Sequence, residues 1–162
     1  MEEKKEPQIQ SESSAALKKA LALLERCEQC RAGLERKLVQ KGFSKNVAAG
    51  VLDALEEKGF LSDSRFARAW LNSRRISRYE GRSRLLAELA ARGISKEISK
   101  KAVDDFFEEF DEEEICAKAA QKFLSRGFSG KKFFSAMTRA GFSYKQASQF
   151  ANLKAIEAAG DF

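Results

Sequence analysis

Apolar residues recur along this chain every three to four positions, which is the spacing of one face of an amphipathic helix. The clearest stripes are Val47, Val51, Ala54 and Leu55; Phe66, Ala69 and Trp70; Leu85, Leu86 and Leu89; and Val103, Phe106, Phe107 and Phe110. The only proline is Pro7, so residues 8–162 lack the residue that most often interrupts helices. The pattern predicts an all-α protein with helices over residues 13–29, 31–41, 45–58, 62–78, 82–92, 96–109, 112–126, 130–140 and 144–158.

A glycine, an apolar residue and a serine recur between these helices. The pattern occurs at Gly42-Phe43-Ser44, Gly93-Ile94-Ser95, Gly127-Phe128-Ser129 and Gly141-Phe142-Ser143, and with one inserted residue at Gly59-Phe60-Leu61-Ser62. Glycine readily takes the left-handed conformation that ends a helix, and serine is a favoured N-cap of the next helix. Gln146 lies three residues after Ser143, which is the spacing of a capping box. The junctions therefore predict short turns between consecutive helices.

The junctions also show an internal repeat. Gly42, Gly93 and Gly141 are 51 and 48 residues apart, and each follows a short helix and precedes a longer one. A unit of three helices is therefore expected three times, over residues 13–61, 62–110 and 111–162, after a polar tail, residues 1–12, that we expect to be disordered. Because one such unit cannot bury its apolar face alone, the units are expected to stack into an elongated, curved body.

Charge is distributed unevenly between these units. Residues 62–101 hold eleven basic and four acidic residues, residues 102–115 hold eight acidic residues and no basic one, and residues 116–162 hold eight basic and two acidic residues. Two basic blocks that flank an acidic segment predict a polarised surface. The charged N-terminus and the lack of a long apolar run predict a cytoplasmic protein that does not associate with membranes.

Little in the sequence indicates enzyme chemistry. The chain has no histidine and no glycine-rich lysine loop for a nucleotide phosphate, so we expect a protein that is not an enzyme and uses no cofactor. Cys27 and Cys30 have half of a zinc-site spacing, but we interpret them as two small residues of a helix, and Cys116 as a core residue. The acidic segment 108–114 is interpreted as a carboxylate-rich helix start, so no metal site is expected.

The segment 62–78 combines a core face with a basic face. On a helix, Phe66, Ala69 and Trp70 fall on one side, whereas Arg65, Arg68, Asn72 and Arg75 fall on another. We therefore expect the aromatic side chains to be core residues and the arginines to form an exposed stripe.

Two segments of this region resemble the RecX family of regulatory proteins. "GFLSDSRFARAW" fits the family pattern G-[FY]-[LI]-x-[DE]-x-x-F-A-x-x-[FYW], and "GRSRLLAELAARGI" fits G-x-x-x-[IL]-x-x-E-L-x-x-[KR]-G-[IV]. The matching positions are Gly59, Phe60, Leu61, Asp63, Phe66, Ala67 and Trp70, and then Gly81, Leu85, Glu88, Leu89, Arg92, Gly93 and Ile94. The detailed match covers residues 58–94, and the resemblance is expected to extend over about residues 15–158.

The resemblance implies a function in DNA recombination, DNA repair and the SOS response. RecX proteins are all-helical, built from tandem three-helix units, and bind in the groove of the RecA filament on single-stranded DNA. There they suppress strand exchange, ATP hydrolysis and co-protease activity without catalysis of their own. For this chain the resemblance implies a monomer that binds the RecA filament and makes a weak direct contact with DNA.

The basic residues are the candidate contacts for that partner. They are Arg65, Arg68, Arg74, Arg75, Arg78, Arg82, Arg84, Arg92, Lys96, Lys131, Lys132 and Arg139. Two alternatives stay open: a stand-alone nucleic-acid-binding protein that uses the arginines on phosphates, and a protein–protein adaptor whose arginines are only solvated.

Overall fold

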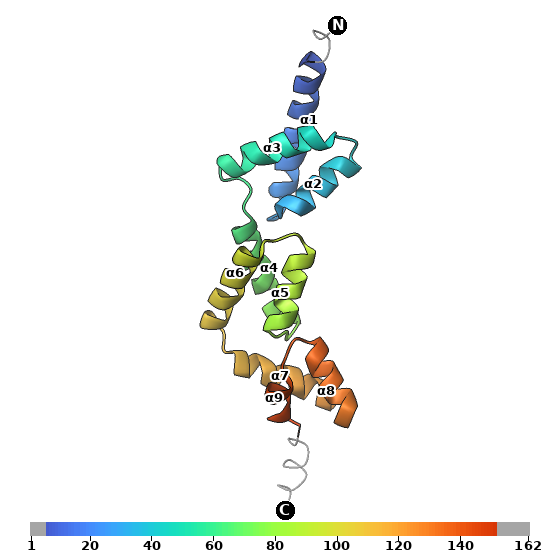
Figure 1. Cartoon of the computed structure of the whole chain (residues 1–162), viewed down its shortest axis with the longest axis vertical. Helices are drawn as coiled ribbons and strands as arrows, with labels where there is room; N and C mark the ends of the chain where they lie inside the picture. Colours follow the sequence, from blue (N-terminus) through green and yellow to red (C-terminus); the bar gives the residue numbers. More distant parts are fainter. Residues whose placement is uncertain (1–5, 152–162) are drawn as a thin grey trace, which may run out of the picture.

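The computed structural model describes residues 6–151, except the side chains of residues 6–9, 76 and 77. Within that range the chain forms nine α-helices and no strand. The helices are α1 (Glu6–Leu24), α2 (Arg31–Gln40), α3 (Lys45–Glu57), α4 (Asp63–Ser77), α5 (Arg82–Ala91), α6 (Lys96–Glu109), α7 (Glu112–Ser125), α8 (Gly130–Arg139) and α9 (Tyr144–Ser148). They follow one another along an elongated body as three units, α1–α3, α4–α6 and α7–α9 (Figure 1).

Most predicted helices agree with the structure to within a few residues, and the two terminal ones differ. Helix α1 begins at Glu6 and ends at Leu24, so the expected disorder of residues 6–12 is wrong, while residues 1–5 lie outside the described residues. Polar residues of α1 have partners in the fold, since the Glu12 carboxylate accepts a 2.8 Å hydrogen bond from the Ser44 backbone N–H. The last helix, predicted over 144–158, ends at Ser148, and its positions beyond residue 151 lie outside the described residues.

The glycine–serine junctions end and begin helices as predicted. The first residue of each pattern, at Gly42, Gly59, Gly93, Gly127 and Gly141, has a φ between 72° and 99°, in the left-handed region that a side chain disfavours. The serine hydroxyls at four of the five N-caps accept a backbone hydrogen bond; the exception is Ser129. The capping box between Ser143 and Gln146 is present. Local sequence therefore determines most of the helix boundaries.

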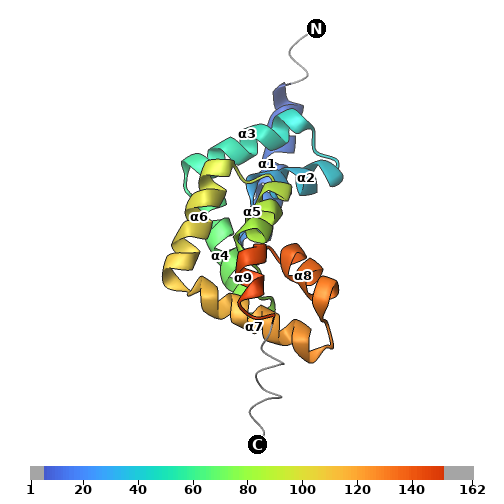
Figure 2. The ribbon, with the colours of Figure 1, turned by 60° about the horizontal axis from the view of Figure 1, so that its bottom comes forward.

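Two hydrophobic cores hold the three units. The first unit has its own core, centred on the fully buried Leu34, Leu38 and Leu52. The second and third units share one continuous core, which includes Leu89 and Phe133. Units α4–α6 and α7–α9 are consequently packed on each other as one body, and α7–α9 gather at the end of α4–α6 (Figure 2).

The core face of α4 differs by one position from the prediction. Ala67 and Leu71 are the buried residues, Phe66 and Trp70 are half-buried, and Ala69 is exposed. The three-residue stripe inferred for this helix was therefore wrong at Ala69. The stripe was too short to fix the helix orientation, because alanine carries little apolar surface.

A hydrogen bond and a close contact at a glycine connect the first unit to the second. The Asp63 carboxylate at the start of α4 accepts a 2.8 Å hydrogen bond from the Arg31 backbone N–H at the start of α2. A β-carbon on Gly93 would lie 2.6 Å from the Ala32 β-carbon, and Gly93 has a φ of 86°. Asp63 and Gly93 belong to the two family-like segments. These segments therefore determine how the first unit packs on the second.

The second and third units meet through a closer backbone contact. The Gly81 backbone N–H donates a 2.8 Å hydrogen bond to the Ala140 carbonyl, and the Ser83 hydroxyl donates a 2.9 Å hydrogen bond to the Gly141 carbonyl. A β-carbon on Gly81 would lie 2.5 Å from the Gly141 carbonyl oxygen, so only glycine fits here without movement. The N-terminus of α5 is thus docked on the turn between α8 and α9.

Candidate partner and nucleic-acid interface

The predicted arginine stripe on α4 is exposed, but its members differ in what they contact. The Arg65 guanidinium donates a 2.8 Å hydrogen bond to Glu28 and a 3.0 Å hydrogen bond to the Phe60 carbonyl. The Arg75 guanidinium lies over the Phe110 ring, 4.3 Å from its centroid. Among the described residues, Arg68 has no hydrogen-bond or ion-pair partner. Arg68 and Arg75 are therefore the stripe arginines that have no carboxylate partner.

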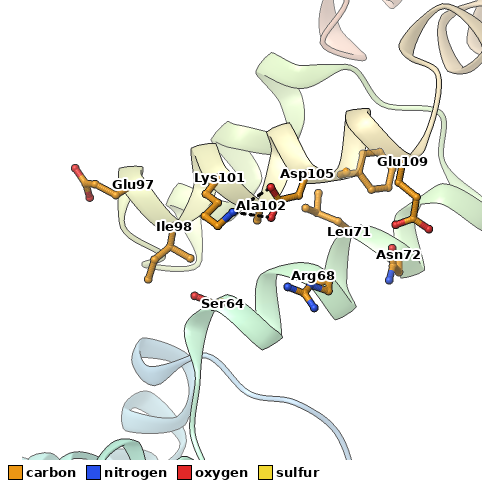
Figure 3. Close-up of a pocket in the computed structure, with 11 residues that line it drawn as sticks. Ser64, Arg68, Leu71, Asn72, Glu97, Ile98, Lys101, Ala102, Asp105 and Glu109 are labelled. Carbon is orange, nitrogen blue, oxygen red and sulfur yellow. Dashed lines mark hydrogen bonds and ion pairs between the residues drawn. The ribbon is translucent and has the colours of Figure 1, made fainter.

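Arg68 lies at the mouth of a pocket of about 270 Å³ between α4 and α6 (Figure 3). Leu71 is among the apolar residues that line it, and Lys101 on the α6 side pairs with Asp105 at 3.2 Å. Glu97 and Glu109 also line the pocket, so its carboxylates outnumber its two cations. This pocket offers mixed charges to a protein surface and is a poor site for a phosphate.

Three of the predicted contact arginines converge on one glutamate. Glu88 lies 2.6 Å from Arg84, 2.7 Å from Arg92 and 3.7 Å from Arg74. The hydrogen bond from Arg92 and the positive charges of Arg84 and Arg74 lower the pKa of the Glu88 carboxyl, and partial burial opposes them. Only Arg74 comes from α4, so its contact with Glu88 joins α4 to α5, whereas the pairs of Arg84 and Arg92 with Glu88 lie within α5 and its C-cap.

The same cluster surrounds the only tryptophan of the chain. The guanidiniums of Arg74 and Arg92 each lie 4.6 Å from the Trp70 ring centroid. The Glu80 side chain, 10% exposed, lies 4.0 Å from Arg74 and 3.9 Å from Arg84. Trp70, a position of the family-like pattern, is thus half-buried and lies against two guanidinium groups.

Arg82 has a structural position as well. Its guanidinium donates a 2.6 Å hydrogen bond to Asp104 on α6 and a 2.8 Å hydrogen bond to Glu112 on α7. It also lies 4.7 Å from the Phe107 ring centroid. Because it bridges the second and third units, Arg82 contributes to packing between them, and its charge is offset by two carboxylates.

The remaining predicted residues have no carboxylate partner among the described residues. Arg78, Lys96 and Lys131 are exposed and have no hydrogen bond from their side chains. Lys132 lies 4.3 Å from the Phe128 ring centroid, and the Arg139 guanidinium donates only to the Ser135 carbonyl, at 3.3 Å. With Arg68 and Arg75, these are the predicted residues whose charge is available to a partner.

Sequence reasoning missed three further cations of this kind in the third unit, Lys122, Arg126 and Lys145. None of them has a carboxylate partner among the described residues, and Lys122 lies 5.8 Å from the Tyr79 ring centroid. Residues 115–151 hold seven basic residues and no acidic one, a signal that was present in the sequence. Only Lys118 of this stretch pairs with a carboxylate, Glu114, at 2.5 Å.

The cysteines differ from the prediction in one respect. Cys27 and Cys30 lie in the connection between α1 and α2, not in a helix, and Cys27 is exposed while Cys30 is buried. Cys116 is buried in the shared core as predicted, and burial raises the pKa of its thiol to about 11. Within residues 6–151, no group of three or more histidine, cysteine or acidic residues could hold a metal ion. In the same range, no helix has the length and apolar character that a bilayer span requires.

Comparisons with known proteins define the class of this helical-repeat protein. Residues 16–55 match the family described as RecX, first three-helix domain, and residues 62–103 match RecX, second three-helix domain. The regulatory protein RecX of Treponema pallidum is 40% identical over 124 residues, 76% of each chain. That of Mycolicibacterium smegmatis is 34% identical over 104 residues, 64% of this chain and 54% of the relative. The chain belongs to the RecX family.

Solved structures of the family have the same fold. A crystal structure of regulatory protein RecX superposes with a TM-score of 0.79 at 18% identity, covering 93% of this chain and 77% of that one. The structure of RecX from Lactobacillus salivarius gives a TM-score of 0.73 at 17% identity, covering 91% of this chain and 98% of that one. The all-helical architecture of stacked three-helix units predicted from the glycine junctions is thus confirmed.

Proposed function

We propose that this protein regulates the RecA filament, binding it on single-stranded DNA and suppressing its ATP hydrolysis, strand exchange and co-protease activity. In this proposal it acts as a monomer in the cytoplasm and has no catalytic activity of its own. The observation that carries the proposal is membership of a family whose members are named regulatory proteins. An elongated body with exposed, unpaired cations also suits a contact spread along a filament.

The proposal is tested by the DNA-dependent ATPase of RecA. The protein is titrated into RecA on a circular single-stranded DNA, and ATP hydrolysis is expected to fall at substoichiometric or stoichiometric protein. A titration with the double variant Lys131→Glu/Lys132→Glu is the matched comparison, since both lysines are exposed and neither has a carboxylate partner. An ATPase rate unchanged at a large excess of the wild-type protein contradicts the proposal.

A second candidate is a nucleic-acid-binding protein that acts without RecA. It is favoured by the third unit, where seven basic residues lie in a stretch with no acidic residue. The two candidates differ in the requirement for RecA. Tight binding to single-stranded DNA in the absence of RecA, steeply weakened by salt, together with an unchanged RecA ATPase, favours the second.

A further inference from the structure

A groove of about 520 Å³ lies where the second unit meets the third. Four segments line it: the turn that follows α4, α5, α7 with its following turn, and α8 with its C-cap. Its cations come from all four, Arg78 after α4, Arg84 on α5, Lys122 on α7 and Arg139 on α8. The close Gly81–Gly141 contact holds these elements together, so the groove is built by the packing of the two units.

The charge in this groove is largely uncompensated. Arg78, Lys122 and Arg139 have no carboxylate partner among the described residues. The one carboxylate of the lining, Glu80, is 10% exposed and lies within 4.0 Å of Arg74 and 3.9 Å of Arg84, so its charge is offset by those arginines. Like charges that converge without a counter-charge raise one another's electrostatic free energy, and a bound anion relieves it.

Aromatic rings line the same groove. Phe123 and Phe128 are stacked with their centroids 5.6 Å apart and 17° between their planes, and Tyr79 lies 5.8 Å from the Lys122 ammonium. All three rings are half-buried, so part of each is open to solvent. The alanines of the lining, Ala119 among them, leave room beside these rings. Cations beside partly exposed rings are the arrangement that binds a phosphate and a base together.

We propose that this groove binds a nucleotide unit, with the phosphate held by Arg78, Lys122 and Arg139 and the base placed against the aromatic rings. This inference adds a binding site to the proposed function. It rests on the proposed function only for the source of the ligand, which is the DNA strand of the RecA filament. The pocket between α4 and α6 is the contrasting case, because Glu97, Asp105 and Glu109 there repel a phosphate.

The first test measures binding to the full-length protein without RecA. The probe is a fluorescently labelled single-stranded oligonucleotide of about 12 nucleotides, followed by anisotropy over a series of salt concentrations. The double variant Arg78→Ala/Arg139→Ala is expected to weaken binding about 10-fold or more and to reduce the slope of log affinity against log salt by about 1 to 2.

A matched variant controls for the loss of two positive charges. Arg26 and Arg36 of the first unit are exposed, and the Arg36 guanidinium donates only to a backbone carbonyl at 3.3 Å, as that of Arg139 does. The double variant Arg26→Ala/Arg36→Ala is expected to change affinity less than about 2-fold. Equal losses in the two variants overturn the proposal, because the charge then acts only through the net charge of the protein.

A second variant tests the base. Tyr79→Leu keeps an apolar side chain of similar reach but removes the ring, and it is expected to weaken oligonucleotide binding about 5-fold or more while leaving the salt slope unchanged. Inorganic polyphosphate, which has no bases, is expected to bind more weakly than the oligonucleotide and to ignore this change. If polyphosphate binds as tightly as the oligonucleotide, and Tyr79→Leu changes the affinity of neither, the groove is a general anion site. That result overturns the proposal.

The source of the nucleotide is distinguished by competition. If unlabelled oligonucleotide displaces the labelled one but millimolar adenosine triphosphate does not, the groove binds a nucleic-acid strand. If the triphosphate displaces it at a comparable phosphate concentration, the groove binds a free nucleotide. Failure to bind either overturns this inference and leaves the RecA proposal intact, since inhibition of the RecA ATPase is measured separately.

Discussion

Residues 62–101 of the second unit and residues 115–151 of the third unit are both strongly basic, yet only the stretch in the third unit leaves most of its basic side chains without an ion pair. Residues 62–101 hold eleven basic residues, of which Arg65, Arg74, Arg82, Arg84, Arg92, Lys100 and Lys101 lie within ion-pair distance of a carboxylate. Residues 115–151 hold seven, of which only Lys118 does. Net charge along a sequence is therefore a poor measure of the charge that a partner meets.

The difference arises from where the carboxylates lie. Glu80, Glu88 and Asp104 lie inside the second unit, and Glu112 reaches it from α7, so its arginines find carboxylates on their own helix or on neighbouring helices. The third unit has no carboxylate of its own after Glu114 within the described residues. We infer that the arginines of the second unit mainly fix the fold and that cations of the third unit mainly contact a partner.

The largest effect is expected from breaking the contact that joins the two regions. Gly81→Ala places a β-carbon 2.5 Å from the Gly141 carbonyl oxygen, although the φ of −84° suits any residue. Because backbone must move to relieve this clash, a loss of about 2 kcal/mol or more in the free energy of unfolding is expected, measured by urea denaturation.

Gly50→Ala is the matched control for this substitution. Gly50 lies within α3, and a β-carbon there meets no atom within 4 Å, so the change is expected to stabilise the protein by about 0.5–1 kcal/mol. Equal denaturation midpoints for the wild type and Gly81→Ala contradict the close approach of the two units.

The next-largest effect is expected from removing a carboxylate that pairs with arginines of the second unit. Glu88→Gln leaves Arg74, Arg84 and Arg92 without their shared carboxylate, and a loss of about 1–2 kcal/mol in unfolding free energy is expected. Because the folded state lowers the pKa of Glu88, its contribution is present above the unfolded value of about 4.3 and is lost as pH falls through the folded pKa. The variant is therefore expected to lose less stability between about pH 5 and pH 3 than the wild type. Parallel acid-denaturation curves argue against this role.

The third test compares the two regions directly in function. Lys131→Glu/Lys132→Glu and Arg68→Glu/Arg75→Glu each reverse two exposed charges that have no carboxylate partner, so each is expected to change unfolding free energy by less than about 0.5 kcal/mol. Both are expected to weaken inhibition of the RecA ATPase, most at low salt, with the larger rise in half-inhibitory concentration, about 10-fold, for the lysine pair. A larger rise for the arginine pair places the main contact on α4, and no change in either means that both faces are only solvated.

Which features the sequence could predict depends on how far apart the interacting residues are along the chain. The helix ends at Gly42, Gly93 and Gly141 were predictable, because the residues that form a cap are adjacent in the chain. The role of Arg82 was not, because its partners Asp104 and Glu112 lie on other helices and only the tertiary packing brings them together. For Glu88, the pairs with Arg84 and Arg92 have a spacing of four residues in the sequence, and only the contact with Arg74 on α4 depends on the tertiary packing. The groove residue Lys122 lies in a basic stretch that the sequence does show, but its position beside Arg78 and Arg139 follows only from the tertiary packing.

The smallest effect concerns one position that the three units fill differently. The residue six positions after the repeat glycine is Ala48, Ser99 or Ala147; all three are buried, and within the described residues the Ser99 hydroxyl has no hydrogen-bond partner. A buried hydroxyl without a partner costs more free energy than a methyl group in the same place. Ser99→Ala is therefore expected to raise the unfolding free energy by about 1 kcal/mol, seen as a higher thermal midpoint, without a change in RecA inhibition. The reverse change in the third unit, Ala147→Ser, is expected to lower stability by a similar amount, because it puts the same hydroxyl into the equivalent buried site. A destabilised Ser99→Ala protein contradicts the unpaired state of that hydroxyl and shows that the second unit, already held by paired charges, also uses a polar contact in its core.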